Sequence, residues 1–336
     1  MAESPQFSVI VPVYNRIGEV RDLVDSLLAQ TSKDFELIVV EDGSTTPCRE
    51  IVEDAASRGL NASYYYKENE GRSIARNAGM EKARGRWFVF FDSDCVIPPD
   101  YFATLAEELR KTPCDCFGGP DAAHSSFSDT QKAINYAMTS FLTTGGIRGG
   151  KVRLEKFTPR TFNMGFTRDV YNCVGGFREM FSEDIDMSKR IARAGFRTIL
   201  IRPAYVWHKR RIDFRKFLRQ VYVFGMSRIT LHLLYPGSLK PVHALPAIFV
   251  AGTALLIALA IAVSPWFLLP LAVYFSAIFI FALAGTRSPK IAALAVPAAA
   301  VQLGGYGCGF LKAWWTKIVL RKGRDINEEI LLRKGK

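Results

Sequence analysis

Cysteine and histidine are scarce in this chain. Its 336 residues include six cysteines and four histidines, and the cysteines show no paired metal-ligand spacing. This excludes a disulfide framework and argues against a zinc site, so we interpret the cysteines as ordinary thiols in a reducing, cytoplasmic compartment. The cysteines are Cys48, Cys95, Cys114, Cys116, Cys173 and Cys308.

Two further absences concern the membrane. The N-terminus "MAESPQFS" has neither a basic region nor an apolar region, so we expect no cleaved signal peptide. The stretch from Ala244 to Gly285 has no charged residue. As one helix it would be about 63 Å long, roughly twice the hydrocarbon thickness of a bilayer. Ser264-Pro265 divides it into segments 244–263 and 266–285, which predicts a membrane hairpin.

The apolar region 244–311 ends in a third uncharged segment, 291–311. This segment contains Pro297, Gln302 and four glycines between 304 and 309. It could therefore cross the membrane, dip into it or lie in it. The tail 312–336 is basic, which predicts that it lies on the cytoplasmic side together with the N-terminal domain.

The formal net charge of +12 is concentrated beside these apolar segments. Residues 211–229 place apolar side chains on one side of a helix and basic side chains, such as Arg211 and Arg215, on the other. We interpret residues 211–243 as a basic amphipathic helix in the membrane interface with a linker. The alternative is a helix packed on the N-terminal domain. Anionic headgroups and anionic substrates fit this charge, and nucleic acid is not expected as a partner.

Residues 1–210 alternate between strand and helix patterns. "FSVIVPVYN" (7–15) and "FELIVVEDGST" (35–45) are typical of buried strands, and "IGEVRDLVDSLLAQT" between them has helical spacing. The alternation predicts an α/β domain with a Rossmann-like, mainly parallel sheet and helices on both faces. The Gly-rich segment 143–151 predicts a flexible loop, and "RTILIRPAYVWHKRR" (197–211) predicts one final strand.

Polar residues follow three of these strands, in "PVYN", "EDGS" and "DSD". Ligands bind beyond the carboxyl ends of parallel strands, although each motif alone could be an ordinary turn. Asp92 and Asp94 are two residues apart, so both can face one ligand. Two close carboxylates repel each other, and Mg²⁺ or Mn²⁺ held together with a diphosphate would relieve this repulsion.

Five motifs occur in a fixed order: "SVIVPVYNR", "LIVVEDGSTT", "NEGRSIARNAG", "FVFFDSDC" and "FSEDIDMSKRIARAGF". Over residues 6–230 the chain resembles the family 2 glycosyltransferases, which are inverting enzymes with the GT-A fold. The resemblance implies that a sugar nucleotide contacts Pro12, Tyr14, Glu41, Asp42, Asn69, Gly71, Arg76 and Asp92. It also implies that Asp94, together with Asp92, holds the metal.

The resemblance further implies that Asp184, beside Glu183, is the catalytic base. A positioned carboxylate can take the proton of the acceptor hydroxyl while the metal stabilises the departing diphosphate. The alternative is that both acids are ordinary first-turn residues of a helix opened by Ser182 and favoured by its macrodipole. His208, at the end of the last predicted strand, is either a further metal ligand or a structural histidine.

The chain departs from the family pattern after residue 210. Many processive members carry Gln-x-x-Arg-Trp, where this chain reads "FLRQVYVFGMSR". We expect Arg219, Gln220 and Arg228 to contact the diphosphate or the acceptor in its place.

Together these features predict a multi-pass glycosyltransferase of the cytoplasmic (inner) membrane, metal-dependent and inverting, with its catalytic domain in the cytoplasm. It would move one sugar from a UDP- or GDP-sugar to a lipid-linked or glycan acceptor in cell-surface polysaccharide assembly. A processive polysaccharide synthase is disfavoured by the missing motif and the few membrane segments. A nucleotidyltransferase would need a Gly-rich phosphate loop that "VPVYNR" lacks, and an inactive membrane scaffold is disfavoured because the acids are retained.

Overall fold

The computed structural model describes residues 4–122, 127–144, 157–209 and 213–323. The chain divides into two compact units, which we name the sheet unit (1–124 and 157–209) and the helical unit (125–156 and 210–336). Segment 125–156 belongs to the helical unit, whereas the sequence placed it within the catalytic range 1–210.

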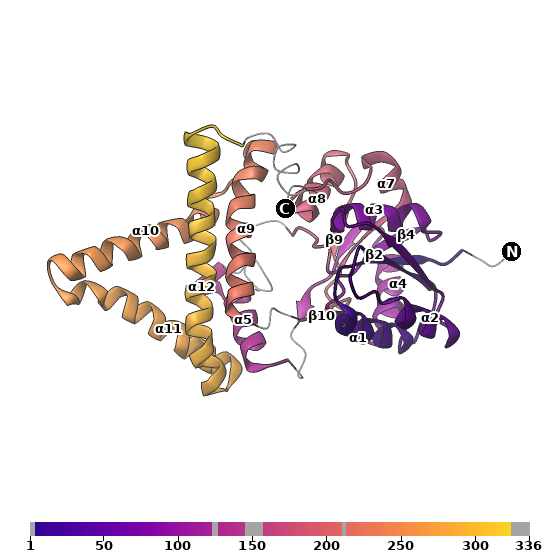
Figure 1. Ribbon diagram of the computed structural model, residues 1–336, viewed down its shortest axis with the longest axis horizontal. Helices are drawn as coiled ribbons and strands as arrows, with labels where there is room; N and C mark the ends of the chain where they lie inside the picture. Colours follow the sequence, from indigo (N-terminus) through magenta and orange to yellow (C-terminus); the bar gives the residue numbers. More distant parts are fainter. Residues whose placement is uncertain (1–3, 123–126, 145–156, 210–212, 324–336) are drawn as a thin grey trace. The chain divides into compact units, whose positions relative to one another are not determined.

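The sheet unit is built on a seven-stranded sheet with the order β3-β2-β1-β4-β8-β6-β9 (Figure 1). Its strands are β1 (Phe7–Val13), β2 (Phe35–Asp42), β3 (Ala62–Lys67), β4 (Trp87–Phe90), β6 (Cys116–Gly118), β8 (Met164–Thr167) and β9 (Thr198–Leu200). Strand β8 runs antiparallel to both of its neighbours, and the other four pairings are parallel. The predicted mainly parallel sheet is therefore confirmed.

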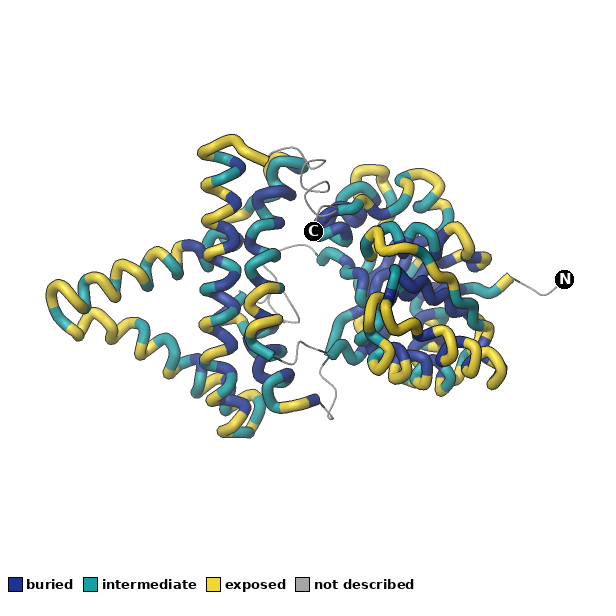
Figure 2. Tube along the Cα trace, viewed as in Figure 1, coloured by how far each residue is buried: buried dark blue, intermediate teal, exposed yellow. Residues whose placement is uncertain are grey.

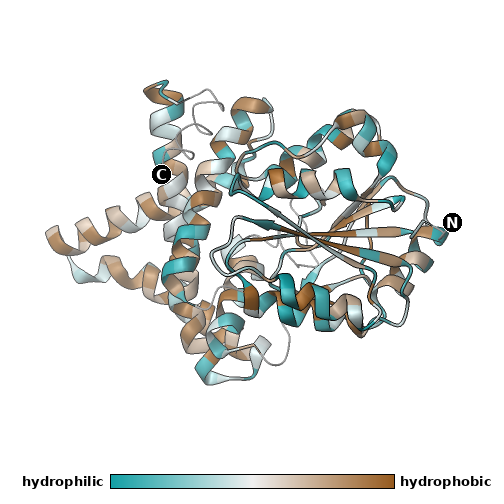
Figure 3. Cartoon of the chain, turned by 45° about the vertical axis from the view of Figure 1, so that its right-hand side comes forward, coloured by the Kyte–Doolittle hydropathy of each residue, from teal (hydrophilic) through white to brown (hydrophobic). Residues whose placement is uncertain are grey.

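Helices cover both faces of this sheet, as predicted (Figure 3). One face packs on α1 (Ile17–Leu28), α2 (Arg49–Ser57) and α4 (Tyr101–Lys111), and the other on α3 (Arg72–Lys82), α7 (Arg168–Val174) and α8 (Glu183–Arg193). In β1, Val9 and Val11 join the first core and Ile10 joins the second, and all three are fully buried. A strand covered on both sides reads as a continuous apolar run, and this strand does.

A second, three-stranded sheet has the order β5-β10-β7, with β5 (Cys95–Val96), β7 (Asp121–Ala122) and β10 (Val206–His208). The prediction of one strand over 197–211 is wrong, because β9 lies in the larger sheet and β10 in this one. Pro203 stands between them. Proline cannot donate a ladder hydrogen bond and interrupts a central strand.

The helical unit contains five long helices and three short elements in its described part. They are α5 (Asp129–Thr139), α6 (Phe141–Thr144), α9 (Phe214–Leu234), α10 (Pro241–Ala262), the 3₁₀ turn η1 (Pro265–Leu268), α11 (Leu269–Thr286), α12 (Pro289–Ala313) and the π-helical turn η2 (Trp314–Val319). Residues Pro241–Ala262, Pro265–Thr286 and Pro289–Val319 are each long and apolar enough to cross a membrane. The predicted break at Ser264-Pro265 separates the first two.

The predicted amphipathic helix is α9, which begins at Phe214 and ends at Leu234; Arg211 lies outside the described residues. It packs along α12 within the helical unit. Of the predicted flexible loop, residues 145–151 lie outside the described ranges, as do residues 324–336 of the tail.

Candidate active site

The polar ends of β1, β2 and β4 lie at one edge of the larger sheet. Parallel pairing sets Val13 beside Glu41 and Ile10 beside Phe90, so the residues that follow these strands emerge together. Asp92 and Asp94 follow shortly after β4, and the ion pairs described below connect the N-terminal turn of α8 to Asp92. Acids far apart in sequence therefore share this edge.

Asp94 and His208 come together where the small sheet forms. Strand β10 pairs with β5 so that His208 is opposite Cys95, and Nε2 of His208 lies 3.1 Å from Oδ1 of Asp94. On the other side of the ring, Oδ2 of Asp121 lies 3.8 Å from Nδ1. The imidazole also stacks on the ring of Phe162 with centroids 4.8 Å apart. His208 is thus flanked by a carboxylate at each ring nitrogen.

These donors fit a divalent metal ion. Two neighbouring ligands held about 2.1 Å from one ion are themselves about 3 Å apart, which matches Asp94 and His208. Cys95 lies in the same cluster, with its ligand atom within 4.8 Å of theirs. Its side chain is fully buried, however, burial raises the pKa of its thiol well above the ordinary range, and the thiol donates to the carbonyl of Phe162. Asp94 and His208 are therefore the residues of this cluster that could hold a metal ion, and the Cys95 thiol is the less suitable donor.

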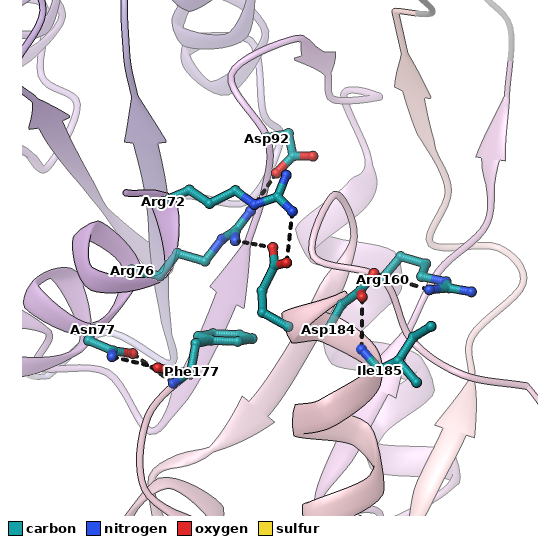
Figure 4. A network of polar contacts seen from close by, with 9 residues as sticks. Arg72, Arg76, Asn77, Asp92, Arg160, Phe177, Asp184 and Ile185 are labelled. Carbon is teal, nitrogen blue, oxygen red and sulfur yellow. Dashed lines mark hydrogen bonds and ion pairs between the residues drawn. The ribbon is translucent and has the colours of Figure 1, made fainter. Parts of the chain in front are cut away.

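A buried ion-pair network connects Asp92 to α8 (Figure 4). Arg76 of α3 donates from Nη2 to Oδ1 of Asp92 at 2.7 Å and from Nη1 to Oε1 of Glu183 at 3.0 Å. Arg72, one turn earlier, donates to the other Glu183 oxygen at 2.7 Å. Arg76 and Glu183 are almost fully buried, whereas the side chain of Arg72 is 56% exposed. Both Glu183 oxygens are therefore bound by arginines.

Asp184 has a different environment from its neighbour. Its Oδ1 accepts the backbone N–H of Ile185 at 2.8 Å, and its Oδ2 lies 3.3 Å from Nη1 of Arg160. Burial alone would raise the pKa of this carboxyl, but the charges of Arg160 and Arg72 and the Ile185 hydrogen bond outweigh burial and lower it. Asp184 is therefore ionised at neutral pH, as a proton acceptor must be.

The chain enters α8 through a strained residue. Ser182 is the N-cap of α8, as expected, with φ 62° in the left-handed region and no cap hydrogen bond from its side chain. Such a conformation costs roughly 1–3 kcal/mol and persists only where surrounding contacts fix it. Five residues before Ser182, the backbone of Phe177 exchanges two hydrogen bonds with the Asn77 side chain, which ties this part of the chain to α3 (Figure 4).

The predicted nucleotide-contacting residues in "LIVVEDGSTT" and "NEGRSIARNAG" mainly form hydrogen bonds with other residues of the chain. Glu41 is fully buried, and its oxygens accept hydrogen bonds from the Ser44 hydroxyl and from the backbone N–H of Cys48 at 2.8 Å. Asp42 accepts from Lys67 at 2.9 Å and from the Gly71 N–H at 2.9 Å. These two acids shape the loops at the edge of the sheet, and most of their capacity to accept hydrogen bonds is used within the chain.

The turn that leads into α3 is fixed by the same contacts. The Asn69 side chain donates to the Asp42 carbonyl at 2.9 Å. Gly71 has φ 102°, which favours glycine, and a Cβ on Gly43 would lie 2.6 Å from the Asn69 nitrogen. This close approach explains why the two motifs pair a glycine with an asparagine.

The remaining predicted residues have more open surroundings. Pro12 is partly buried and Tyr14 is 51% exposed at the end of β1. Arg219, Gln220 and Arg228 lie on α9 of the helical unit, with Arg219 exposed. Their predicted contacts with diphosphate or acceptor stay predictions.

Sequence reasoning missed three residues of this site: Arg72, Asp121 and Arg160. Arg72 could have been found, because it lies four residues before Arg76 on the same helical face. Asp121 and Arg160 lie outside every recognised motif, and only the packing of distant segments brings them to His208 and Asp184.

The model of the family described as "Glycosyl transferase family 2" matches residues 8–181, about half of the chain. "Uncharacterized glycosyltransferase EpsJ" of Bacillus subtilis (strain 168) is 39% identical over 114 residues, which are 34% of this chain and 33% of that protein. "Glycosyltransferase GlyA" of Streptococcus pneumoniae serotype 4 is 37% identical over 115 residues, which are 34% of this chain and 16% of that protein. The matches thus span a third or less of these relatives' lengths.

Among solved structures, a mannosyltransferase from Pyrobaculum calidifontis, PcManGT in complex with GDP-Man and Mn²⁺, is similar with a TM-score of 0.57. The similarity covers 94% of this chain and 89% of that one at 19% sequence identity. At this identity it supports the fold alone, and it agrees with the GT-A-like architecture predicted from the motifs.

Proposed function

The chain belongs to glycosyl transferase family 2, and we propose that it is a membrane-anchored, metal-dependent, inverting enzyme that transfers one sugar. The donor would be a nucleoside-diphosphate sugar, UDP- or GDP-linked, as in the solved relative that contains GDP-Man. The acceptor would be a lipid-linked or glycan hydroxyl in cell-surface polysaccharide assembly. We place the enzyme in the cytoplasmic (inner) membrane with the sheet unit in the cytoplasm.

One observation carries this proposal. Arg76 and Glu183 connect the α8 turn that carries Asp184 to Asp92, and Asp92 lies two residues before Asp94 of the Asp94–His208 pair. The Asp94–His208 pair is suited to a metal with a diphosphate, and Asp184 to accepting a proton. A transferase that displaces a diphosphate with a hydroxyl needs both.

The metal site would be formed by Asp94 and His208, with Asp92 beside them. A divalent ion there would neutralise the charge that develops on the departing diphosphate. An imidazole ligand favours Mn²⁺ over Mg²⁺, because Mg²⁺ is bound mainly through oxygen.

Asp184 is the better base of the two predicted acids. Its carboxylate is ionised, and it is held in place by Arg160 and the Ile185 N–H, so it can take the acceptor proton as the acceptor oxygen attacks. Glu183 is fully buried with both oxygens bound by arginines, so its role is to position Arg72 and Arg76. Attack from the side opposite the diphosphate would invert the anomeric carbon.

The test is turnover by the purified full chain in detergent. Incubation with radiolabelled UDP- and GDP-sugars, with Mn²⁺ or Mg²⁺, should give donor-specific hydrolysis and, with membrane lipid extracts, a labelled product carrying one sugar. A long polymer would favour the processive alternative. Absence of turnover with every donor and both metals would favour the inactive scaffold.

A further inference from the structure

The three apolar segments of the helical unit differ in how much of their surface is covered by the rest of the chain. Only 6% of the most apolar window of α10 is buried and 11% of that of η1–α11, against 50% for α12 and η2. The first two expose large side chains such as Ile248, Ile261 and Phe281. Between Pro289 and Phe310, α12 exposes no large hydrophobic residue, and the apolar positions that it exposes are small ones such as Ala293 and Ala300. Figure 2 shows this contrast between the yellow hairpin and the dark α12. Neighbouring helices therefore cover half of this window of α12 and η2, and very little of the hairpin.

Helix α9 is the closest of these neighbours. A Cβ on Gly225 would lie 2.0 Å from the Tyr306 carbonyl oxygen, and a Cβ on Gly309 would lie 2.0 Å from that of Tyr222. The two backbones are thus in direct contact. Farther along, the Lys317 ammonium donates to the Thr230 hydroxyl at 2.9 Å, so both helices run in the same direction over this length. Wherever α12 lies in a membrane, α9 lies with it.

Helix α9 is not suited to the hydrocarbon region. Arg215, Lys216 and Arg219 are exposed on it, and they lie next to Phe217, which packs near Ala298 at the middle of α12. If α12 crossed the bilayer, these three cations would be placed in hydrocarbon, where charged side chains are rare and costly. In the interface they would meet headgroups. No Asp or Glu occurs between Phe214 and Gly323, so this surface suits anionic lipids.

Helices α10 and α11, in contrast to α9, are suited to the hydrocarbon region. Helices α10 and α11 carry no charge between Ala244 and Gly285 and project to one side, away from α9 and α12, as Figures 1 and 3 both show. At 22 residues each, α10 and η1–α11 would be about 33 Å long, enough for a hydrocarbon layer of roughly 30 Å. Trp266 is 77% exposed at the tip, and Trp314 and Trp315 are exposed at the end of α12, where aromatic side chains commonly mark the two interfaces.

We infer that α9 and α12 lie together in the plane of an anionic membrane interface and that only α10 and α11 cross the bilayer. The inference rests on the proposed membrane association and names the surface that carries it. An even number of crossings returns the chain to the side from which it entered. The end of η2 therefore faces the same compartment as the sheet unit.

The side of each segment is tested by cysteine labelling in sealed membrane vesicles of both orientations, with a maleimide that cannot cross the bilayer. Cys173 is exposed in the sheet unit and reports its side. Lys322→Cys and Ser264→Cys are each introduced into a Cys173→Ser, Cys308→Ser background. Lys322→Cys should react in vesicles of the orientation in which Cys173 reacts in the chain that retains it. Ser264→Cys should react only in vesicles of the opposite orientation. Gly323→Cys gives a second reading at the same end. Reaction of Lys322→Cys together with Ser264→Cys would overturn the inference.

The depth of α12 provides an independent measurement. Spin labels at Ala300→Cys and, as the matched control, Ile257→Cys of α10 are compared in nanodiscs containing anionic lipid. The Ala300 label should be more accessible to a polar nickel chelate, and the Ile257 label to oxygen. Equal depth at the bilayer centre would overturn the inference.

Both tests are distinguishable from a failure of the proposed function. Loss of the chain from membranes in an alkaline wash would overturn membrane anchoring and this inference together, whatever the transferase assay gives. If the protein stays in the membrane fraction, cysteine labelling and spin-label accessibility determine its topology. They do so even if the protein shows no transferase activity.

Discussion

Arg76 and Glu183 form an ion pair that is almost completely removed from solvent, with Nη1 3.0 Å from Oε1 and side chains only 1% and 2% exposed. The pair joins α3 to the first turn of α8 across 107 residues of sequence. Arg76 also pairs with Asp92, and Glu183 also pairs with Arg72, so two arginines and two carboxylates form one network. Removing the charge of Arg76 or Glu183 therefore leaves this network with an unbalanced charge.

Glu183→Gln should therefore destabilise the sheet unit. Breaking a buried pair by removing one charge costs roughly 3–5 kcal/mol, and a shift of about 2–4 °C in Tm accompanies each kcal/mol in a domain of this size. Thermal unfolding in detergent checks this. Asp54→Asn removes one charge of the exposed Arg58–Asp54 pair and should leave Tm nearly unchanged. An equal Tm for Glu183→Gln and Asp54→Asn would contradict the structural role of Glu183.

Asp184→Asn should abolish transfer and spare donor binding. The amide keeps the shape of the side chain but cannot accept the acceptor proton, and the loss of a general base lowers kcat by about 10²–10⁴-fold. Single-turnover transfer and donor titration by calorimetry separate the two effects. Normal transfer by this variant would show that the base is another residue.

Arg160→Gln should move the acid limb of the pH–rate profile to higher pH. In the native chain the pKa of Asp184 is below its ordinary value of 3.8, since Arg160, Arg72 and the Ile185 N–H outweigh burial. Removing the Arg160 charge leaves burial in place, so the pKa of Asp184 rises and the base is lost at a higher pH. A depressed pKa also stabilises the fold above the unfolded-state pKa, and this contribution disappears as pH falls through the folded-state pKa. The Arg58→Gln control should leave the profile of kcat/KM unchanged, and an unchanged profile in Arg160→Gln would argue against control of Asp184 by Arg160.

Asp94→Ala should remove metal-dependent donor binding. Calorimetry of the purified chain with Mn²⁺, and of donor with and without Mn²⁺, measures both steps. Asp54→Ala, on the surface of α2, serves as the control for loss of one carboxylate. Retention of Mn²⁺ affinity by Asp94→Ala would place the metal elsewhere.

Asp121→Ala should weaken Mn²⁺ binding although Asp121 is not an expected ligand. Its carboxylate lies 3.8 Å from Nδ1 of His208, on the side of the ring away from Asp94, and is placed to orient the imidazole. Loss of such a supporting partner typically costs 10–100-fold in metal affinity, so about that loss is expected here. Asp121→Asn keeps an acceptor oxygen and should restore most of the affinity. Equal affinity in all three proteins, measured by calorimetry at matched Tm, would remove Asp121 from the site.

The sequence by itself determined the α/β fold, the hairpin of two apolar helices and the family. Strands β1, β2 and β4 are continuous apolar runs because both faces of the sheet are covered, and such runs can be recognised locally. The break at Ser264-Pro265 is equally local, as are the acids that follow β4. These features depend on residues a few positions apart, so periodicity and motif spacing predict them.

The tertiary structure alone decided the partners of these residues. Asp94 meets His208 across 114 residues and Asp184 meets Arg160 across 24, and α5, which lies within the predicted catalytic range, packs against α12 in the helical unit. The motifs predict nucleotide contacts for Arg76 and Glu41, and the tertiary structure shows that both are buried with their charges engaged within the chain. The position of α12 likewise follows from α9, whose backbone contacts it at Gly225 and Gly309. Long-range packing determines which charges are neutralised and which faces stay free, and a local pattern contains no information on either.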